Sequence, residues 1–250
     1  MSQNMPHSLI LTLLLSISFF GFLLIGVLGF RLPTFQGSFL WQKDIIGIFY
    51  GLVCLFGIFA ALFPSSCSQI VNLNKKEKSA NNSDLEQDKI ISQTFEVRGH
   101  HRMCGNFSSH VFRLRGKVFC ASCTGLLIGG LLSLAGSILY FFCNWYIGSG
   151  LFLFAFGVFG VALNMLSILL FDLWIKHLVR VSLNIYFVFG TFLILVAINE
   201  QAQNFGLNLL VIAFSIFWLL TRISLSQWRH NRICNACGVE NCAFRHVRAS

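Results

Sequence analysis

The sequence predicts an all-α polytopic membrane protein with six transmembrane helices, a small zinc-ribbon-like β-hairpin insertion and a cysteine-rich C-terminal tail. Three observations support this prediction. Hydrophobic residues make up 56% of the 250 residues and charged residues 11%, whereas soluble domains have about 25% charged residues. Six apolar runs approach the length of about 20 residues that a helix needs to cross a bilayer. Two segments rich in Cys and His accompany these runs.

The six apolar runs define the predicted helices in chain order. They lie at residues 9–30, 45–63, 125–143, 150–171, 181–198 and 207–225. The first run is long for the apolar region of a signal peptide and follows a head without Lys or Arg, so we interpret it as a retained span. The chain has too little charge for a soluble monomer and is too apolar for a disordered chain.

The positive charges indicate the orientation of these helices. Of the 18 Lys and Arg residues, only Arg31 and Lys43 fall on the loops of one side. The others lie in the loops 64–124 and 172–180 or near the C-terminus. The positive-inside rule therefore predicts an integral cell-membrane protein with both termini and the long loop in the cytoplasm. This asymmetry accounts for the net charge of +9 without a nucleic-acid partner.

Polar residues are sparse within the predicted spans. Asn164, Asn184 and Asn208 are amides, which usually join neighbouring membrane helices. Asp172 and Arg222 are placed at the cytoplasmic ends of their spans. No Asp, Glu, Lys or His falls at mid-membrane, which counts against a proton pump or a carrier of charged solutes.

Small residues recur at helical spacing in the third predicted span. Gly125, Gly129, Ser133 and Ser137 are each four residues apart, so they share one helix face. Such rows allow two helix backbones to approach closely. We therefore expect this face to pack tightly inside the bundle rather than to act as a gate.

The predicted spans divide the chain into five segments. They are transmembrane helices 1–2 (1–63), a polar cytoplasmic linker (64–93), a Cys/His metal-binding module (94–124), transmembrane helices 3–6 (125–225) and the cysteine-rich tail (226–250).

The module carries the spacing of a zinc site. His101-x-x-Cys104 precedes Cys120-x-x-Cys123, with fifteen residues between the two pairs. This is the tetra-cysteine zinc pattern with one Cys replaced by His, and His100 is an alternative to His101. Two β-prone runs around a Gly-containing turn lie between the pairs and predict a hairpin. Four ligands would close the coordination sphere of a structural zinc, and the ion would supply folding energy to a segment without a core.

The position of Cys123, two residues before the third span, predicts that zinc clamps the module to that helix. The N-terminus of a helix favours thiolate, and a reducing cytoplasm keeps cysteines out of disulfides.

This segment resembles a domain-of-unknown-function family of small prokaryotic membrane proteins, in which a Cys/His/Arg segment is followed by Cys-x-Arg-Cys-Thr-Gly at the start of a membrane helix. The matching residues are His101, Arg102, Cys104, Gly116, Cys120, Cys123, Thr124 and Gly125. Ser122 stands where that family favours Arg. The resemblance implies a prokaryotic membrane protein and carries no activity with it.

The tail predicts a second zinc site. Its candidate ligands are Cys234, Cys237, Cys242 and His246. Their spacing is close to that of a retroviral-type zinc knuckle with the last two ligand types exchanged, and His230 is an alternative fourth ligand. One shared site of Cys120, Cys123, Cys234 and Cys237 is a further alternative, as is an iron–sulfur cluster.

These features favour a non-enzymatic role. A closed zinc sphere has no position for a reacting water, and no G-x-S-x-G, P-loop or H-E-x-x-H motif is present. We therefore expect a scaffold that binds a cytoplasmic protein partner through a zinc-stabilised face. The alternatives are a membrane redox, thiol or iron–sulfur protein, suggested by the Cys-x-x-Cys pairs, and a small-solute transporter or channel.

Overall fold

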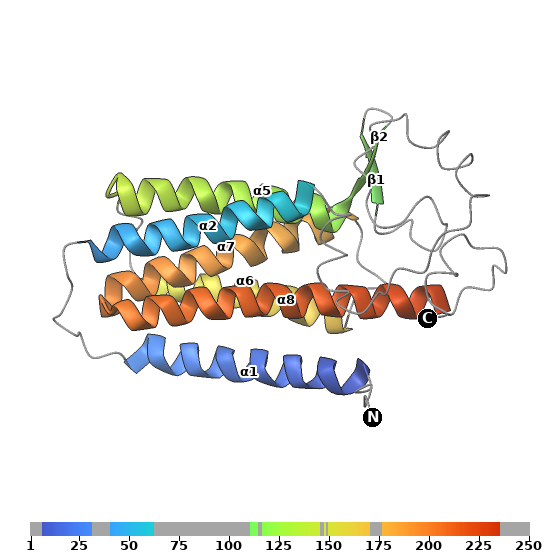
Figure 1. Ribbon diagram of the computed structural model, residues 1–250, viewed down its shortest axis with the longest axis horizontal. Coiled ribbons are helices and arrows are strands. Elements are labelled where there is room, and N and C mark those ends of the chain that lie inside the picture. Colours follow the sequence, from blue (N-terminus) through green and yellow to red (C-terminus); the bar gives the residue numbers. More distant parts are fainter. Residues whose placement is uncertain are drawn as a thin grey trace, which may run out of the picture.

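Six helices long and apolar enough to cross a membrane make up most of what the computed structural model describes, which is residues 7–31, 41–62, 111–114, 117–145, 148, 150–170 and 177–235. They are α1 (His7–Arg31), α2 (Gln42–Leu62), α5 (Ala121–Ser137) with its π-helical continuation η2 (Ile138–Phe142), α6 (Gly150–Leu170), α7 (His177–Ala202) and α8 (Phe205–Asn235) (Figure 1). Each of the six predicted apolar runs lies on one of these helices, which confirms the helical membrane class.

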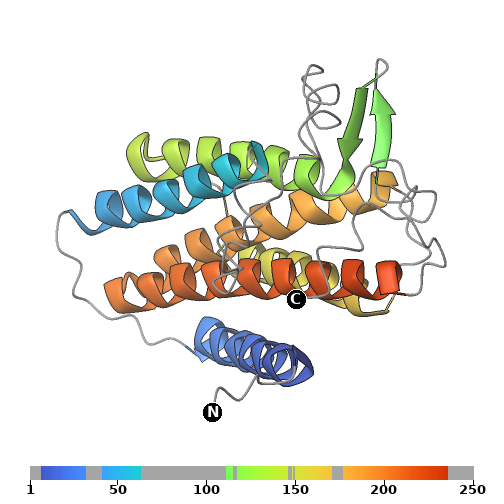
Figure 2. The ribbon, with the colours of Figure 1, turned by 45° about the vertical axis from the view of Figure 1, so that its right-hand side comes forward.

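The helices alternate in direction along the bundle. The start of α1, the start of α5 and the end of α8 therefore lie at one end, beside the hairpin (Figures 1 and 2). We call this the hairpin end and the opposite one the far end. The loop between α7 and α8 lies at the far end (Figure 1).

Two helices extend beyond the predicted apolar runs. α5 begins at Ala121, four residues before the predicted start, and α8 continues to Asn235 although its apolar run ends at residue 225. No Gly or Pro occurs between Leu207 and Cys237, so nothing in this stretch breaks the helical hydrogen bonds once the apolar residues end. The predicted tail therefore begins as helix, and residues 236–250 lie outside the described part.

A two-stranded antiparallel hairpin precedes α5. Strand β1 (Val111–Leu114) pairs with β2 (Lys117–Cys120), and Phe112 lies opposite Phe119. Their rings stack with centroids 5.7 Å apart, and the Phe112 ring also stacks on His177, the first residue of α7, at 6.2 Å. The hairpin thus rests on the start of α7, and its second strand leads directly into α5.

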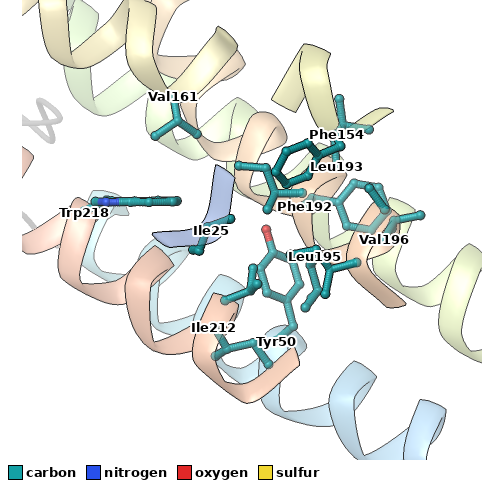
Figure 3. Packing of buried hydrophobic residues seen from close by; sticks show 14 of the residues in the cluster. Ile25, Tyr50, Phe154, Val161, Phe192, Leu193, Leu195, Val196, Ile212 and Trp218 are labelled. Carbon is teal, nitrogen blue, oxygen red and sulfur yellow. The ribbon is translucent and has the colours of Figure 1, made fainter. Parts of the chain in front are cut away.

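The core lies around α7, the most buried of the candidate spans. Tyr50 of α2, Phe154 of α6, Phe192 of α7 and Trp218 of α8 are nearly fully buried in one cluster (Figure 3). Large apolar side chains such as Phe56 are exposed on the outward helix faces. In a bilayer, those faces would contact lipid.

Glycines allow α7 to approach its neighbours backbone to backbone. A Cβ atom on Gly125 of α5 would lie 2.6 Å from the Val181 carbonyl oxygen, and one on Gly129 would lie 3.0 Å from the Ile185 carbonyl oxygen. The row predicted from small residues is therefore a close helix contact. α6 repeats this packing at Gly157, where a Cβ would lie 2.7 Å from the Gly190 carbonyl oxygen of α7.

We predict that Gly125→Ala destabilises the folded bundle by about 1–3 kcal/mol, because the added methyl group must push the backbones of α5 and α7 apart. Thermal unfolding of the purified full-length protein in detergent measures the change. Gly57→Ala is the matched control, since a Cβ there meets nothing within 4 Å. Equal melting temperatures for the two variants would contradict the close approach of α5 and α7.

Candidate functional site

The first turn of α5 holds a pair of cysteines at the hairpin end. Cys120 is both the last residue of β2 and the N-cap of α5, with extended backbone angles (φ −77°, ψ 121°). Cys123 follows three residues later within the first helical turn, so the two side chains share one face. The Thr124 hydroxyl donates to the Cys120 carbonyl oxygen at 2.9 Å. The sequence-based placement of Cys123 two residues before the helix is therefore wrong, because the helix already begins at Ala121.

The surroundings of Cys120 favour a negatively charged sulfur. The pKa of its thiol is lowered to about 6, mainly by a hydrogen bond from the Cys123 side chain and against the opposing effect of burial. The backbone N–H groups of Cys123 and Ser122 and the positive charge of Arg222 lower the pKa further. An N-terminal helical turn and a nearby guanidinium are surroundings that generally stabilise thiolate.

Two buried arginines accompany the cysteine pair. Arg180 of α7 is 9% exposed and Arg222 of α8 is 4% exposed. Both guanidinium groups are attracted by Cys120, and Arg222 is also attracted by Cys123. Three helices that are far apart in the sequence thus contribute to one site.

Amide side chains hold Arg222 in place. Its Nη2 atom donates to the Oδ1 atom of Asn184, and the same oxygen accepts from Asn164 Nδ2 at 3.1 Å. Asn164 also donates to the Leu183 carbonyl oxygen at 2.7 Å, and Arg222 lies 5.9 Å from the centre of the Phe187 ring. The prediction that Asn164 and Asn184 join helices is therefore confirmed.

Acidic side chains do not balance the arginines within the described ranges. There the acidic residues are Asp44, in the first turn of α2, and Glu200, near the end of α7. These two helix ends lie at the far end of the bundle (Figure 1). The Nε atom of Arg222 is buried and has no hydrogen-bond partner among the residues that the structure describes. In the described part of the hairpin end, the cysteine sulfurs are therefore the side-chain groups that can carry negative charge beside Arg222.

The structure places only part of the predicted ligand sets. Cys120 and Cys123 lie together, and Cys234 lies in the last turn of α8. His100, His101, Cys104, Cys237, Cys242 and His246 lie outside the described residues. Among the residues that are described, no group of three or more His, Cys, Asp or Glu could hold a metal ion.

The course of α8 bears on the shared four-cysteine alternative. Cys234 follows Arg222 by twelve residues of continuous helix, which is about 18 Å along the helix axis. Arg222 interacts electrostatically with Cys120 and Cys123, and zinc–sulfur bonds are only about 2.3 Å long. A shared site that includes Cys234 would therefore require Cys120 and Cys123 to reach the end of α8, well beyond Arg222.

A second polar cluster lies at the far end. The Tyr140 hydroxyl donates to Glu200 Oε1 at 2.5 Å and accepts from Asn199 Nδ2 at 2.9 Å. Asn208 Nδ2 donates to Asn199 Oδ1 at 3.1 Å, and Lys43 Nζ lies 4.5 Å from the centre of the Tyr140 ring. This cluster ties η2 to α7 and α8, which confirms a joining role for Asn208.

Sequence reasoning missed the role of both arginines in the site. Arg222 was assigned to the end of its span, in agreement with the candidate span Phe205–Ser226, but its nearly complete burial was not foreseen. The usable signal was a charged residue within an apolar helix, which is costly and therefore often functional.

Comparison of the chain with family models, with curated proteins and with solved structures gives no match.

Proposed function

We propose that this chain is a membrane protein whose hairpin end is stabilised by zinc and presents a binding surface to a cytoplasmic protein partner. His101, Cys104, Cys120 and Cys123 would be the ligands. One observation carries the proposal: the junction between β2 and α5 places two thiols on one helical turn beside Arg222. Thiolates are the form in which cysteine binds zinc.

The hairpin register supports a return of the first ligand pair to the second. Val111 pairs with Cys120 across the hairpin, so the chain that enters β1 starts beside the residues that leave β2. Cys104 lies seven residues before Val111. An extended segment of that length reaches about 23 Å at most, which leaves ample chain for His101 and Cys104 to fold back toward Cys120.

The charge of the surroundings supports a thiolate-rich centre. Three thiolates and one imidazole around a zinc dication leave one net negative charge. Arg180 and Arg222 supply positive charge next to it, which offsets the cost of placing an anionic centre at the membrane boundary. Because four protein ligands leave no open position, such a centre stabilises a surface and performs no hydrolysis.

A second zinc ion is proposed for the tail, with Cys234, Cys237, Cys242 and His246 as ligands. The end of α8 at Asn235 supports this arrangement. Cys234 would then be a ligand on the last turn of a rigid helix, and the following ligands would come from the chain after it. The two zinc sites would lie on the same side of the membrane.

A thiol-redox function is the second candidate, and one observation favours it. Cys123 and Cys120 contact each other through their side chains, so their sulfurs could form a disulfide. Glutathione disulfide would accept the two electrons and two protons, and its own sulfur–sulfur bond would break. The transporter alternative is weakened, because Asn164 and Asn184 are occupied by bonds between helices.

We predict close to two zinc ions per chain, with little iron, in elemental analysis of the purified protein. Cys120→Ser or Cys123→Ser should remove the zinc of the hairpin end and leave the zinc of the tail. Cys237→Ser should remove the zinc of the tail and leave the zinc of the hairpin end. Each variant leaves three ligands, which hold the ion much more weakly. Cys54→Ser is the control, since Cys54 is buried in the bundle.

Other metal contents would contradict this assignment in distinct ways. One zinc lost entirely in both Cys120→Ser and Cys237→Ser would show a shared site. Iron with a visible absorption band would show a cluster instead. The redox candidate would be supported by protein that holds no metal and in which Cys120 and Cys123 form a disulfide with each other when glutathione disulfide is added.

We predict that reporter fusions at Ser79 and Ser250 lie in the cytoplasm and that fusions at Gln36 and Gln203 lie outside. The concentration of Lys and Arg on one side is the physical reason. A reporter at Ser79 found outside would contradict this orientation and the reducing environment that free zinc-binding thiols need.

A further inference from the structure

Arg222 is a charged side chain buried inside a candidate membrane span. It is 4% exposed, and the span covers Phe205–Ser226. A buried charge in a membrane helix is costly unless an opposite charge or several hydrogen bonds compensate it. The structure must therefore contain a group that compensates the charge of Arg222.

Its bonded neighbours are neutral and therefore orient the side chain without cancelling its charge. Asn184 accepts from Nη2, and the Phe187 ring lies 5.9 Å away. Asn164 holds Asn184 through the same oxygen. The Nε atom remains buried without a partner among the described residues. This arrangement fixes the direction of the guanidinium and leaves its charge to another group.

The packing brings the start of α5 to Asn184, the residue that bonds this guanidinium. Asn184 lies against Gly125, where an added Cβ would come within 2.6 Å of the Asn184 Cβ. Gly125 is two residues beyond Cys123 and in the first turns of α5. Across the described ranges, the two acidic residues belong to the start of α2 and the end of α7, and these helix ends lie at the far end (Figure 1). Among the described residues, the sulfurs of Cys120 and Cys123 are therefore the groups at this end of the bundle that can carry a balancing negative charge.

We propose that Arg222 is the permanent counter-charge of the sulfur centre at Cys120 and Cys123 and restricts that centre to a net negative state. In its metal-bound form this inference rests on the proposed zinc function. Three thiolates and one imidazole around a dication satisfy the restriction. Two thiolates and two imidazoles form a neutral set, which leaves the buried guanidinium uncompensated. Arg222 is a positioning residue here, because a guanidinium has no lone pair to offer a metal.

Arginine suits this role because its charge persists and its N–H groups diverge in a fixed plane. One N–H group bonds Asn184, and the Nε–H group has no hydrogen-bond partner among the described residues. The inference would connect α8 with the start of α5 through the Arg222 side chain, although their residues are about a hundred positions apart in the sequence. A change at the sulfur centre would act directly on the sixth membrane helix.

The test is cobalt binding by the full-length protein in detergent, followed by the absorption band of thiolate-bound Co²⁺. Arg222→Gln removes the charge and keeps a polar N–H donor on the side chain. We expect its Co²⁺ affinity for the Cys120–Cys123 site to fall by about 10–100-fold. Arg222→Lys should restore most of it, and Lys43→Met, which removes a charge at the far end, should change nothing.

To isolate this site, all four proteins carry Cys237→Ser. Wild-type affinity in Arg222→Gln overturns the proposal. Loss in Arg222→Lys as large as in Arg222→Gln also overturns it, because the charge would then be irrelevant. If Arg222→Gln does not fold, Arg222→Lys decides in the same way: near-normal affinity supports the counter-charge and a large loss refutes it.

A second measurement separates this proposal from the zinc function. If the protein with native Arg222 binds no Co²⁺, the zinc proposal fails, and the Cys120–Cys123 couple is then equilibrated with glutathione and quantified by mass spectrometry. Arg222 would stabilise the negative, reduced sulfurs. Arg222→Gln should therefore be oxidised more readily, by about tenfold in the equilibrium constant or about 30 mV. An unchanged midpoint potential refutes the counter-charge.

Discussion

The close approach of α5 and α7 at Gly125 is the contact on which the rest of the hairpin end depends. Because Gly125 has no side chain, the first turns of α5 lie against the Val181 carbonyl oxygen and the Asn184 side chain. This contact sets the depth of Cys120 and Cys123 in the bundle. It also places them at the level of Arg222, which Asn184 holds from the other side. A wider spacing of the two helices would move the sulfurs away from the charge that stabilises them.

Two clusters of charged and amide side chains lie at opposite ends of the bundle, and a buried hydroxyl pair, Tyr50 and Thr191, lies between them. At the hairpin end, Arg222 and the two amides surround the start of α5. At the far end, Tyr140 and Glu200 form the second cluster. Hydrogen bonds in a low-dielectric interior are costly to leave unmade, so these clusters set the relative depth of the helices.

Local sequence features were enough to predict the helices, the hairpin and the cysteine pair. An apolar run of about 20 residues is itself the physical requirement for a span. Alternating β-prone residues around a Gly-containing turn predict a hairpin without reference to the rest of the chain. Helix ends were less predictable, because α8 continues beyond its apolar run as far as Asn235. Hydropathy reports the thickness of the bilayer, whereas a helix ends where its hydrogen bonds are interrupted.

The sequence by itself determined the membrane class, the number of spans and the spacing of Cys120 and Cys123, since each depends on residues near one another in the chain. Only the tertiary structure decided that Arg180 and Arg222 lie beside those sulfurs. That arrangement depends on the rotation and depth of α5, α7 and α8 relative to one another. No local pattern encodes these quantities. They follow from glycine contacts and amide bonds between helices, which form only when all three helices are packed together.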